Sequence, residues 1–121
     1  MGEYEMGKEY AYARISRKTQ KIERQIENLT KAYPNARIYQ EAYTGTRTEG
    51  RKEFRKMLSV VKPGDTIIFD SVSRMSRNAD DGIKLYMDLY DKGINLVFLK
   101  EQYINTEVYK ESIQQTIDAT G

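Results

Sequence analysis

The alternation of apolar and polar positions along the chain predicts strands and helices in strict alternation. Short apolar runs rich in β-branched and aromatic residues predict strands, and apolar positions at a spacing of three or four predict helices. The predicted strands cover residues 10–15, 36–43, 66–70 and 94–99. The predicted helices cover 19–33, 51–62, 78–92 and a last segment from Asn105 or Thr106 onwards. This order predicts an α/β fold, with a mainly parallel sheet of four to five strands flanked by helices.

Turn and capping signals mark the ends of these elements. Pro34 ends the first helix, residues 63–65 form a Pro-Gly-Asp turn, and Gly93 suits the left-handed position after the third helix. Asn105 or Thr106 could cap the last helix. The third helix is expected to bury a stripe that consists of Ile83, Tyr86, Met87 and Tyr90.

The composition is typical of one globular domain with a modest core. Of 121 residues, 39% are hydrophobic and 31% are charged, which argues against a disordered chain. No apolar run approaches the roughly 20 residues of a membrane span, and the acidic, polar N-terminus does not resemble a secretory signal. We therefore expect a cytoplasmic protein without a membrane partner.

Two residue types are missing, and each absence excludes a class of chemistry. The chain has no cysteine, so it has no disulfide, thiol nucleophile or thiolate metal site. It has no histidine, which excludes a Ser-His-Asp triad and argues against a zinc site of the usual ligands. A general acid or base would have to be a carboxylate, Lys, Tyr, Arg or water.

The net charge is only +2, but the charges are unevenly distributed. Residues 14–77 hold 15 Lys and Arg against 7 Asp and Glu, and all nine arginines lie there. Arginine is favoured over lysine where planar, bidentate recognition of phosphate or carboxylate matters. The pattern fits either a solvated basic face or a phosphate-binding centre.

Several of these basic residues follow the predicted strands directly. Ligands of parallel α/β sheets gather at the carboxyl ends of the strands. Those ends hold Arg14 and Ser16, then residues 41–45, then residues 71–77, and finally Lys100 and Glu101. The topology therefore predicts that the basic residues converge at one edge of the sheet.

Serine and arginine at this edge are the candidates for chemistry. On an extended strand Arg14 shares a face with Ser16, where it could bind the phosphate that the serine attacks. Arg74 and Arg77 are three residues apart, so one helical turn would align them. Arg51 follows a polar loop and opens the second helix. Taken singly, the serine could equally be a cap or turn residue, and the arginines could be solvated.

Together these motifs resemble a known family. "YARIS" (residues 12–16) with Gln20 and Gln25 behind it, "EAYTG" (41–45) followed by Arg51, and "SRMSR" (73–77) after a buried strand are similar to the catalytic domain of serine recombinases, the resolvase and invertase family. The resemblance covers about residues 10–104. It implies a resolvase-like catalytic domain that acts on double-stranded DNA.

The resemblance also implies roles for individual residues. Ser16 would attack a DNA phosphodiester, giving a covalent 5′-phosphoserine link and a free 3′-hydroxyl. The arginines that match the family's catalytic positions are Arg14, Arg51, Arg74 and Arg77, and Arg47 is a further candidate for DNA contact. Gln20 and Gln25 match supporting positions. No metal or cofactor would be needed, and family members act as dimers that assemble into tetramers.

Two departures from the family pattern matter. The family often has an acidic residue directly before the first arginine of "SRMSR", where this chain has Ser73, with Asp70 three residues earlier. The general acid or base therefore stays unassigned. By the resemblance, residues 1–104 are the catalytic domain, with 1–9 as a flexible N-terminus. Residues 105–121 are expected to begin the dimerisation and linker helix, without the DNA-binding domain.

Other classes of protein remain as alternatives. A receiver-type regulatory domain would share the α/β order, with Asp70 and Lys100 imitating its phosphorylation site, but Arg14 and Ser16 stand where it needs a carboxylate pair. A metal-dependent nuclease would use Asp65, Asp70, Asp80 and Asp81. A tyrosine-type recombinase usually relies on histidines. A recombinase-derived domain that only associates with other proteins is the non-catalytic alternative.

Overall fold

The computed structural model describes residues 7–14, 22–41, 51–76 and 78–120. Its four strands form one parallel sheet in the order β2-β1-β3-β4. The strands are β1 (Glu9–Arg14), β2 (Arg37–Glu41), β3 (Thr66–Phe69) and β4 (Asn95–Phe98). The predicted parallel α/β sheet is confirmed. Residues 15, 19–21 and 42–43, at the ends of predicted elements, lie outside the described residues.

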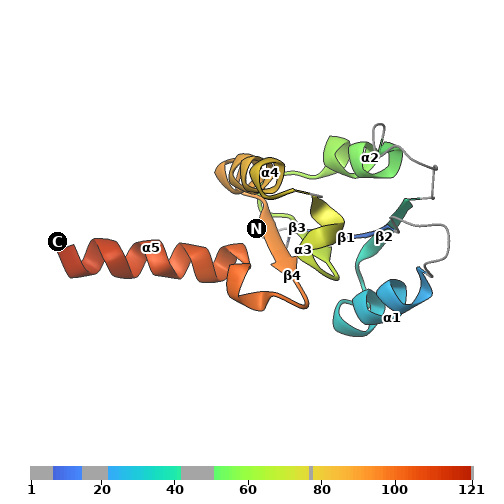
Figure 1. Cartoon of the computed structure of the whole chain (residues 1–121), viewed down its shortest axis with the longest axis horizontal. Helices are drawn as coiled ribbons and strands as arrows, with labels where there is room; N and C mark the ends of the chain where they lie inside the picture. Colours follow the sequence, from blue (N-terminus) through green and yellow to red (C-terminus); the bar gives the residue numbers. More distant parts are fainter. Residues whose placement is uncertain (1–6, 15–21, 42–50, 77, 121) are drawn as a thin grey trace, which may run out of the picture.

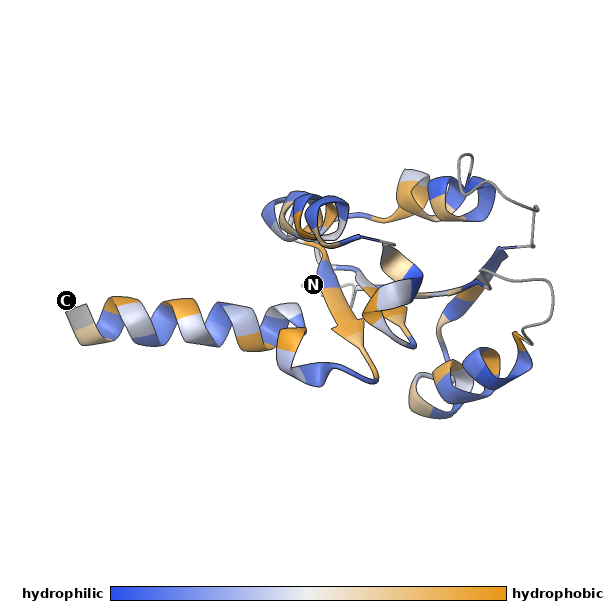
Figure 2. Ribbon diagram, in the orientation of Figure 1, coloured by the Kyte–Doolittle hydropathy of each residue, from blue (hydrophilic) through white to orange (hydrophobic). Residues whose placement is uncertain are grey.

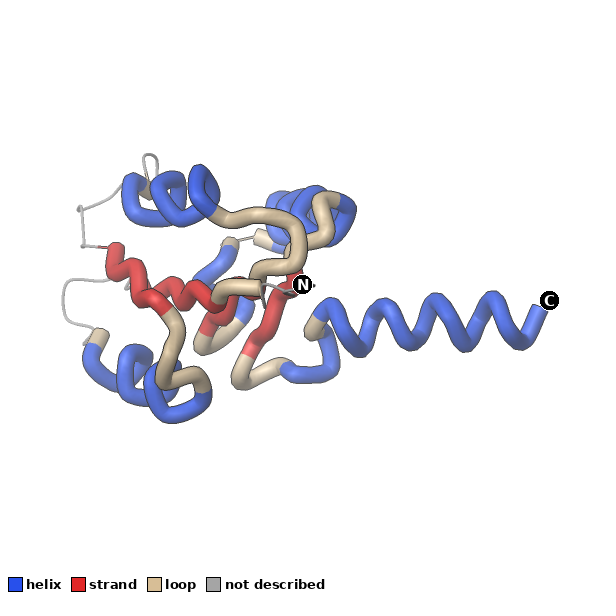
Figure 3. The backbone as a smooth tube through the Cα atoms, turned by 180° about the vertical axis from the view of Figure 1, so that it is seen from behind, coloured by secondary structure: helices blue, strands red, loops and turns tan. Residues whose placement is uncertain are grey.

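Helices cover both faces of this sheet (Figure 1). They are α1 (Glu23–Ala32), α2 (Lys52–Val60), α3 (Val72–Met75), α4 (Ala79–Asp91) and α5 (Thr106–Thr120), with a 3-10 turn η1 (Gln102–Ile104). Helix α1 lies on one face, whereas α2 and α4 lie on the other, and α5 projects away from the body in the front and back views (Figures 1 and 3). The short α3 and η1 are additions to the predicted elements.

The alternation of side chains along the strands divides the core between the two faces. Tyr12, Phe69 and Phe98 point toward α2 and α4, and the rings of Phe69 and Phe98 stack with centroids 5.4 Å apart. Ala11 and Ala13 point the other way, toward α1. Small residues on that face allow α1 to approach the sheet closely, whereas the aromatic face holds the larger share of the buried apolar surface.

Helix α4 corrects one expectation and confirms another. Ile83, which the periodicity placed in the buried stripe, is 63% exposed, whereas Gly82 and Leu89 are buried. The buried face therefore runs one position earlier on the helix than the predicted stripe. At the other end Gly93 has the expected left-handed backbone, with φ +80°. Its N–H donates to the Tyr90 carbonyl at 2.9 Å, as in the usual glycine-terminated helix end.

The junction between β4 and α5 is fixed by two side chains from the start of the helix. The Phe98 N–H donates to Asn105 Oδ1 at 2.7 Å, and the Leu96 N–H donates to Thr106 Oγ1 at 2.9 Å. These bonds satisfy main-chain groups along the outer edge of β4, which would otherwise be open to another strand. Asn105 and Thr106 thus bind the sheet edge, a role that their helix-capping pattern did not predict.

Helix α5 carries polar and apolar residues intermixed along its length (Figure 2). Among the described helices none has both the length and the apolar character required to cross a bilayer.

Candidate active site

The site forms at the carboxyl ends of β1, β2 and β3, where the direction of the chain across the sheet reverses. The chain passes from β1 to β2 over one face and then returns past β1 to β3 over the other. Such a reversal opens a crevice beyond the strand ends. Arg14 is the last residue of β1, and α3 follows β3 almost directly. Both therefore border this crevice.

Arg14 is buried, with 4% of its surface exposed, and its guanidinium contacts the main chain of α3. Its Nε donates to the Arg74 carbonyl at 3.0 Å, and Nη2 donates to the Ser73 carbonyl at 2.8 Å. The main chain of Arg14 is held by Gln25 of α1. The Arg14 N–H donates to Gln25 Oε1 at 3.1 Å, while Gln25 Nε2 donates to the Arg14 carbonyl at 2.6 Å. Gln25 thus fixes the exit of β1.

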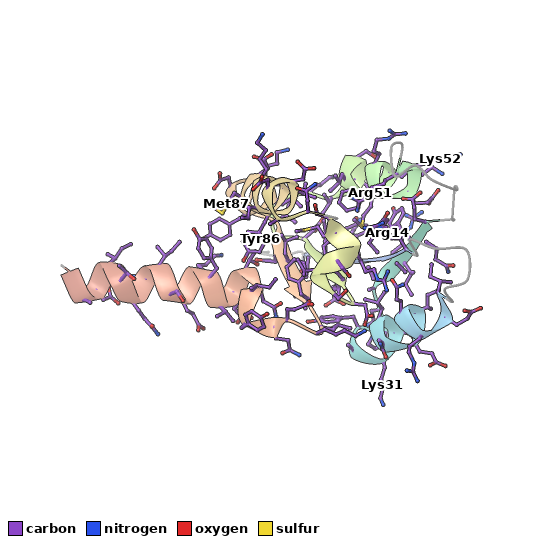
Figure 4. The ribbon with its side chains drawn as sticks, viewed as in Figure 1. Arg14, Lys31, Arg51, Lys52, Tyr86 and Met87 are labelled. Carbon is purple, nitrogen blue, oxygen red and sulfur yellow. The ribbon has the colours of Figure 1, made fainter. Side chains whose placement is uncertain are left out.

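Arg51 reaches the main chain of α3 from the start of α2, and Figure 4 shows it close to Arg14. Its Nη1 donates to the Met75 carbonyl at 2.7 Å, and Nη2 donates to the Arg74 carbonyl at 3.2 Å. The guanidinium carbon lies 3.9 Å from the Phe54 ring centroid, a cation–π distance. Arg14 and Arg51 therefore converge on one peptide oxygen from different elements.

Tyr12 and Glu41 form the support beneath Arg51, and motif reasoning missed both. The Tyr12 hydroxyl donates to Glu41 Oε1 at 2.8 Å and accepts from Arg51 Nε at 3.4 Å. Glu41 also accepts the N–H groups of Glu53 and Phe54, each at 3.2 Å, so it caps the start of α2. The available signal was Glu41 at a strand end, opposite Arg14 in the sheet register.

Burial raises the pKa of the Tyr12 hydroxyl well above its ordinary value of 10.0, although the neighbouring Arg51 acts in the opposite direction. The hydroxyl is therefore neutral at physiological pH and keeps its proton for Glu41. This proton makes the Tyr12–Glu41 contact a charge-assisted hydrogen bond, which is stronger than a bond between neutral groups. The carboxylate, the phenol and the guanidinium form one connected network.

Helix α3 carries Arg74 and ends one residue after it. Arg74 lies in the last turn of α3, and Ser76 directly after the helix is extended, with φ −151° and ψ 151°. Helix α4 begins anew behind its N-cap Asn78, whose side chain accepts the Asp81 N–H at 2.8 Å. Helix α3 therefore ends before residue 77, and the expected alignment of Arg74 with Arg77 falls on a residue outside the described ones. The physical reason is local capping, which ends one helix and starts another.

This part of the structure contains an unsatisfied donor on Arg74 and a cavity beside Arg14 and Arg51. Within the described part of the chain, Arg74 Nε is buried and has no hydrogen-bond partner. A cavity of about 360 Å³ opens beside the cluster, and Arg14, Arg51 and Ser76 are among the residues that line it. A buried N–H without a partner is costly, so an acceptor that reached it would gain free energy.

The predicted supporting residues Asp70 and Ser73 have partners of their own. Asp70 is buried, and its Oδ1 accepts from Asn28 Nδ2 at 3.0 Å while Oδ2 lies 3.2 Å from Lys100 Nζ. The hydroxyl oxygens of Ser73 and Ser71 are 2.8 Å apart. Asp70, at the end of β3, therefore connects to α1 through a hydrogen bond and to the segment after β4 through an ion pair.

The nuclease alternative required its carboxylates to meet, and the sheet separates two of them. Asp65 precedes β3 and accepts the N–H groups of Lys8 and Lys62, each at 2.8 Å, whereas Asp70 follows β3. The two carboxylates thus lie at opposite ends of one strand. A two-metal site needs them within roughly 4 Å of shared ions.

Four of the predicted site residues lie outside the described residues. These are Ser16, Gln20, Arg47 and Arg77. Of the remaining predicted positions, Arg14 and Arg51 come together on the main-chain carbonyl of Arg74, Gln25 holds the main chain of Arg14, and Ser73 provides a carbonyl acceptor.

A family model supplies the observation that decides the assignment. The model described as "Resolvase, N terminal domain" matches residues 9–120. The chain belongs to the resolvase N-terminal domain family. The resemblance stated from the sequence motifs is therefore confirmed.

Individual resolvases agree with this assignment. A resolvase of Clostridium perfringens strain 13 is 33% identical over 96 residues, covering 78% of this chain and 50% of its own length. The transposon Tn501 resolvase of Pseudomonas aeruginosa is 32% identical over 100 residues, covering 83% of this chain and 51% of its own. This resolvase-family chain thus spans about half the length of the curated relatives it matches.

Two solved structures share the fold. The N-terminal catalytic domain of TP901-1 integrase superimposes with a TM-score of 0.69 at 24% identity, covering 93% of this chain and 92% of that one. A resolvase family site-specific recombinase from Streptococcus pneumoniae gives 0.64 at 24% identity, covering 94% and 95%. At this identity the likeness shows the fold, so the predicted resolvase-like architecture is confirmed.

Proposed function

We propose that this domain is the catalytic domain of a site-specific DNA recombinase that uses Ser16 as its nucleophile. The observation that carries the proposal is the convergence of the Arg14 and Arg51 guanidinium groups on the main chain of α3, the helix that carries Arg74, at the carboxyl end of β1. Ser16 is two residues beyond Arg14, and chain connectivity keeps their Cα atoms within about 7 Å of each other. A serine beside clustered guanidinium groups suits attack on a phosphodiester.

In this proposal the chemistry is two successive transesterifications. Ser16 Oγ attacks the phosphorus and loses its proton to a base, the P–O3′ bond breaks, and the 3′-oxygen takes up a proton. The DNA then stays attached to Ser16 through its 5′-phosphate. Rejoining reverses the step, because a 3′-hydroxyl attacks the phosphorus and the P–Oγ bond breaks. The phosphoserine bond conserves the energy, so no high-energy cofactor is required.

The arginines supply positive charge that stabilises the negative charge developing on the phosphate oxygens during this reaction. The guanidinium N–H groups that contact carbonyl oxygens of α3 are the donors that phosphate oxygens would accept from. The buried Nε of Arg74 is a further donor for such an oxygen. Charge stabilisation of this kind lets us propose a metal-independent mechanism. A reaction on DNA is also the reason to place the protein in the cytoplasm.

We further propose that a second copy of the chain packs against α4 and α5. A groove of about 690 Å³ runs between these helices, and its lining includes Ile83, Tyr86 and Tyr103. Ile83 and Tyr103 are 63% and 76% exposed. On α5, Val108, Ile113 and Ile117 add further exposed apolar surface. A patch presented by one face of each copy suits a two-fold dimer, from which a tetramer could assemble.

Sedimentation can test this association directly. Ile117→Asp should shift the recombinase that carries this domain toward the monomer, because it places a charge in the apolar surface. Lys110→Asp, an exposed α5 position outside that apolar set, is the control. An unchanged dimer fraction in Ile117→Asp would contradict the proposed interface.

The catalytic proposal is tested by trapping. The recombinase that carries this domain is incubated with a suicide substrate of its own recombination site, and denaturing gels separate the covalent DNA–protein adduct. Wild type should give the adduct, and Ser16→Ala should lose it while still binding the DNA. An adduct that persists in Ser16→Ala would refute the nucleophile. A wild type that binds DNA without any adduct would favour the non-catalytic association domain.

A further inference from the structure

We infer that Glu101 is a positioning residue for the arginine cluster, acting through α3. This inference rests on the proposed function. Glu101 follows β4, and its Oε1 accepts the main-chain N–H of Val72 at 2.8 Å, across 29 positions of sequence. Val72 is the first residue of α3, the helix that carries Arg74. A carboxylate from the neighbouring strand therefore caps the helix that contributes to the site.

Helix α3 depends on such outside contacts because it is too short to hold itself. It has four residues, and its N-cap Ser71 makes no side-chain capping bond. The Ser71 hydroxyl is instead 2.8 Å from the hydroxyl of Ser73. A single helical turn is unfavourable in isolation, since few hydrogen bonds offset the ordering of its backbone. The charged bond from Glu101 is thus a large part of what orders the start of α3.

The other end of α3 is where the arginines bind. Arg14 and Arg51 donate to the carbonyls of residues 73–75, and both contact the carbonyl of Arg74. An acid at the first N–H and two guanidinium groups at the last carbonyls hold the helix from both ends. Met75 is 1% exposed and anchors it in the core. A shift at the Glu101 end would therefore move the acceptors of Arg14 and Arg51.

Glu101 is itself well placed to act as a fixed support. The Leu99 N–H donates to the Phe69 carbonyl and the Lys100 N–H donates to the Asp70 carbonyl, each at 3.0 Å. The hydrogen-bond ladder between the strands thus continues past the ends of β3 and β4. The ion pair of Lys100 with the buried Asp70 carboxylate reinforces this segment. The carboxylate of Glu101 is consequently presented to α3 from a rigid backbone.

The test removes either partner of the bond and observes the arginines directly. Glu101→Ala removes the acceptor, whereas Glu101→Gln keeps an acceptor oxygen at the same length. Val72→Pro removes the donor from the other side. Proline is tolerated at the first helical position, and Ser71 before it is already extended, with φ −150° and ψ 162°. Glu27→Ala on α1 removes the same charge from an exposed position and serves as the control.

Side-chain Nε–H resonances of Arg14 and Arg51 in the ¹⁵N-labelled chain are the first readout. We expect them to shift and broaden in Glu101→Ala and in Val72→Pro, and to remain near wild type in Glu101→Gln and Glu27→Ala. The double variant Glu101→Ala/Val72→Pro should change them no further than either single variant, since both remove one bond. Unchanged arginine resonances in both single variants would overturn the inference.

Single-turnover DNA cleavage by the recombinase that carries this domain is the second readout. Glu101→Ala should slow cleavage roughly tenfold, the size of one charge-assisted hydrogen bond, with DNA affinity unchanged. Glu101→Gln should recover most of the rate. Equal losses in Ala and Gln together with a general change of the spectrum would show a merely structural residue and overturn the inference. A wild type that never cleaves DNA would refute the proposed function, and the arginine resonances would still decide the role of Glu101.

Discussion

Two polar clusters lie at the carboxyl end of the same sheet, and they handle buried charge differently. On the α1 side, the carboxylate of Asp70 meets the ammonium group of Lys100 and the amide of Asn28. On the α2 side, guanidinium groups of Arg14 and Arg51 donate to main-chain carbonyls and to the Tyr12 hydroxyl. In the first cluster opposite charges neutralise each other. In the second, the acceptors in these bonds are neutral oxygens, and the Glu41 carboxylate is linked to Arg51 through the Tyr12 hydroxyl.

This difference separates a structural cluster from a cluster suited to ligand binding. A buried carboxylate with a matched cation is already compensated and gains little from a further ion. Guanidinium groups on neutral oxygens can exchange them for anionic oxygens, which form shorter and stronger bonds. Arg74, whose carbonyl both guanidinium groups contact, also has a buried Nε without a hydrogen-bond partner among the described residues. The comparison therefore predicts loss of catalysis from changes in one cluster and loss of stability from changes in the other.

The largest effect is expected from Arg14→Ala. If Arg14 stabilises the transition state, single-turnover cleavage should fall by about 100-fold, as for removal of one preorganised donor to developing charge. Arg14→Lys should recover little, because lysine lacks the planar fork. DNA affinity, measured by mobility shift, should fall far less. Arg37→Ala is the control, an exposed strand arginine that lies over Tyr39. If Arg14→Ala lost as much DNA affinity as cleavage rate, Arg14 would not act mainly in the transition state. The proposed catalytic role of the second cluster would then be wrong.

A smaller effect is expected from Lys100→Ala, and it should appear in stability. The variant leaves the Asp70 carboxylate buried without its cation, but the Lys100 side chain is 58% exposed, so water offsets part of the loss. We expect about 1–2 kcal/mol lower free energy of unfolding in urea. Lys56→Ala breaks the exposed pair with Glu53 and should cost under about 0.5 kcal/mol. Equal losses of unfolding free energy in the two variants would show that the Lys100–Asp70 ion pair stabilises the fold no more than the Lys56–Glu53 pair.

The smallest effect is expected in the stability of the fold at alkaline pH, where the Tyr12 hydroxyl that contacts Arg51 loses its proton. The pKa of Tyr12 is raised above its ordinary value of 10.0 on folding, so its neutral form stabilises the native state. That contribution is fully present below about pH 10 and is lost as the pH rises through the folded pKa. Urea midpoints should therefore decline above pH 10 in wild type, and less steeply in Tyr12→Phe. Parallel declines in the two proteins would contradict the raised pKa of the buried Tyr12 hydroxyl.

Periodicity and topology were sufficient to predict the sheet and the edge at which the arginines meet. Arg14 and Arg51 could be predicted as site residues because the sequence marks the boundaries beside them. Arg14 ends β1, and Arg51 directly precedes α2. Glu41 lies at a strand end, but the sequence assigns no role to it or to Tyr12, because their roles depend on contacts with α2, which lies between β2 and β3 along the chain. The contact of Glu101 with Val72 joins two strand exits and has no local signal.

Two predictions from the sequence differ from the structure, and both differences arise because tertiary contacts are not visible in the sequence. A helix of four residues has no periodicity, so the sequence pattern predicts no helix at residues 72–75 and starts the third helix only at residue 78. Ile83 is apolar, yet it lines the surface groove between α4 and α5 and does not enter the core. Hydrophobic character marks either burial or an interface, and only packing distinguishes them.

The proposed function depends on a covalent bond between Ser16 and the 5′-phosphate of the DNA. Mapping that bond is the most direct test of the proposal. The trapped DNA–protein adduct is digested with nuclease and protease, and the modified peptide is sequenced by mass spectrometry. We predict a peptide that carries a phosphate-linked nucleotide remnant on Ser16, attached through the 5′ end of the DNA. A remnant on one of the ten tyrosines, on another serine, or attached through the 3′ end would contradict the account.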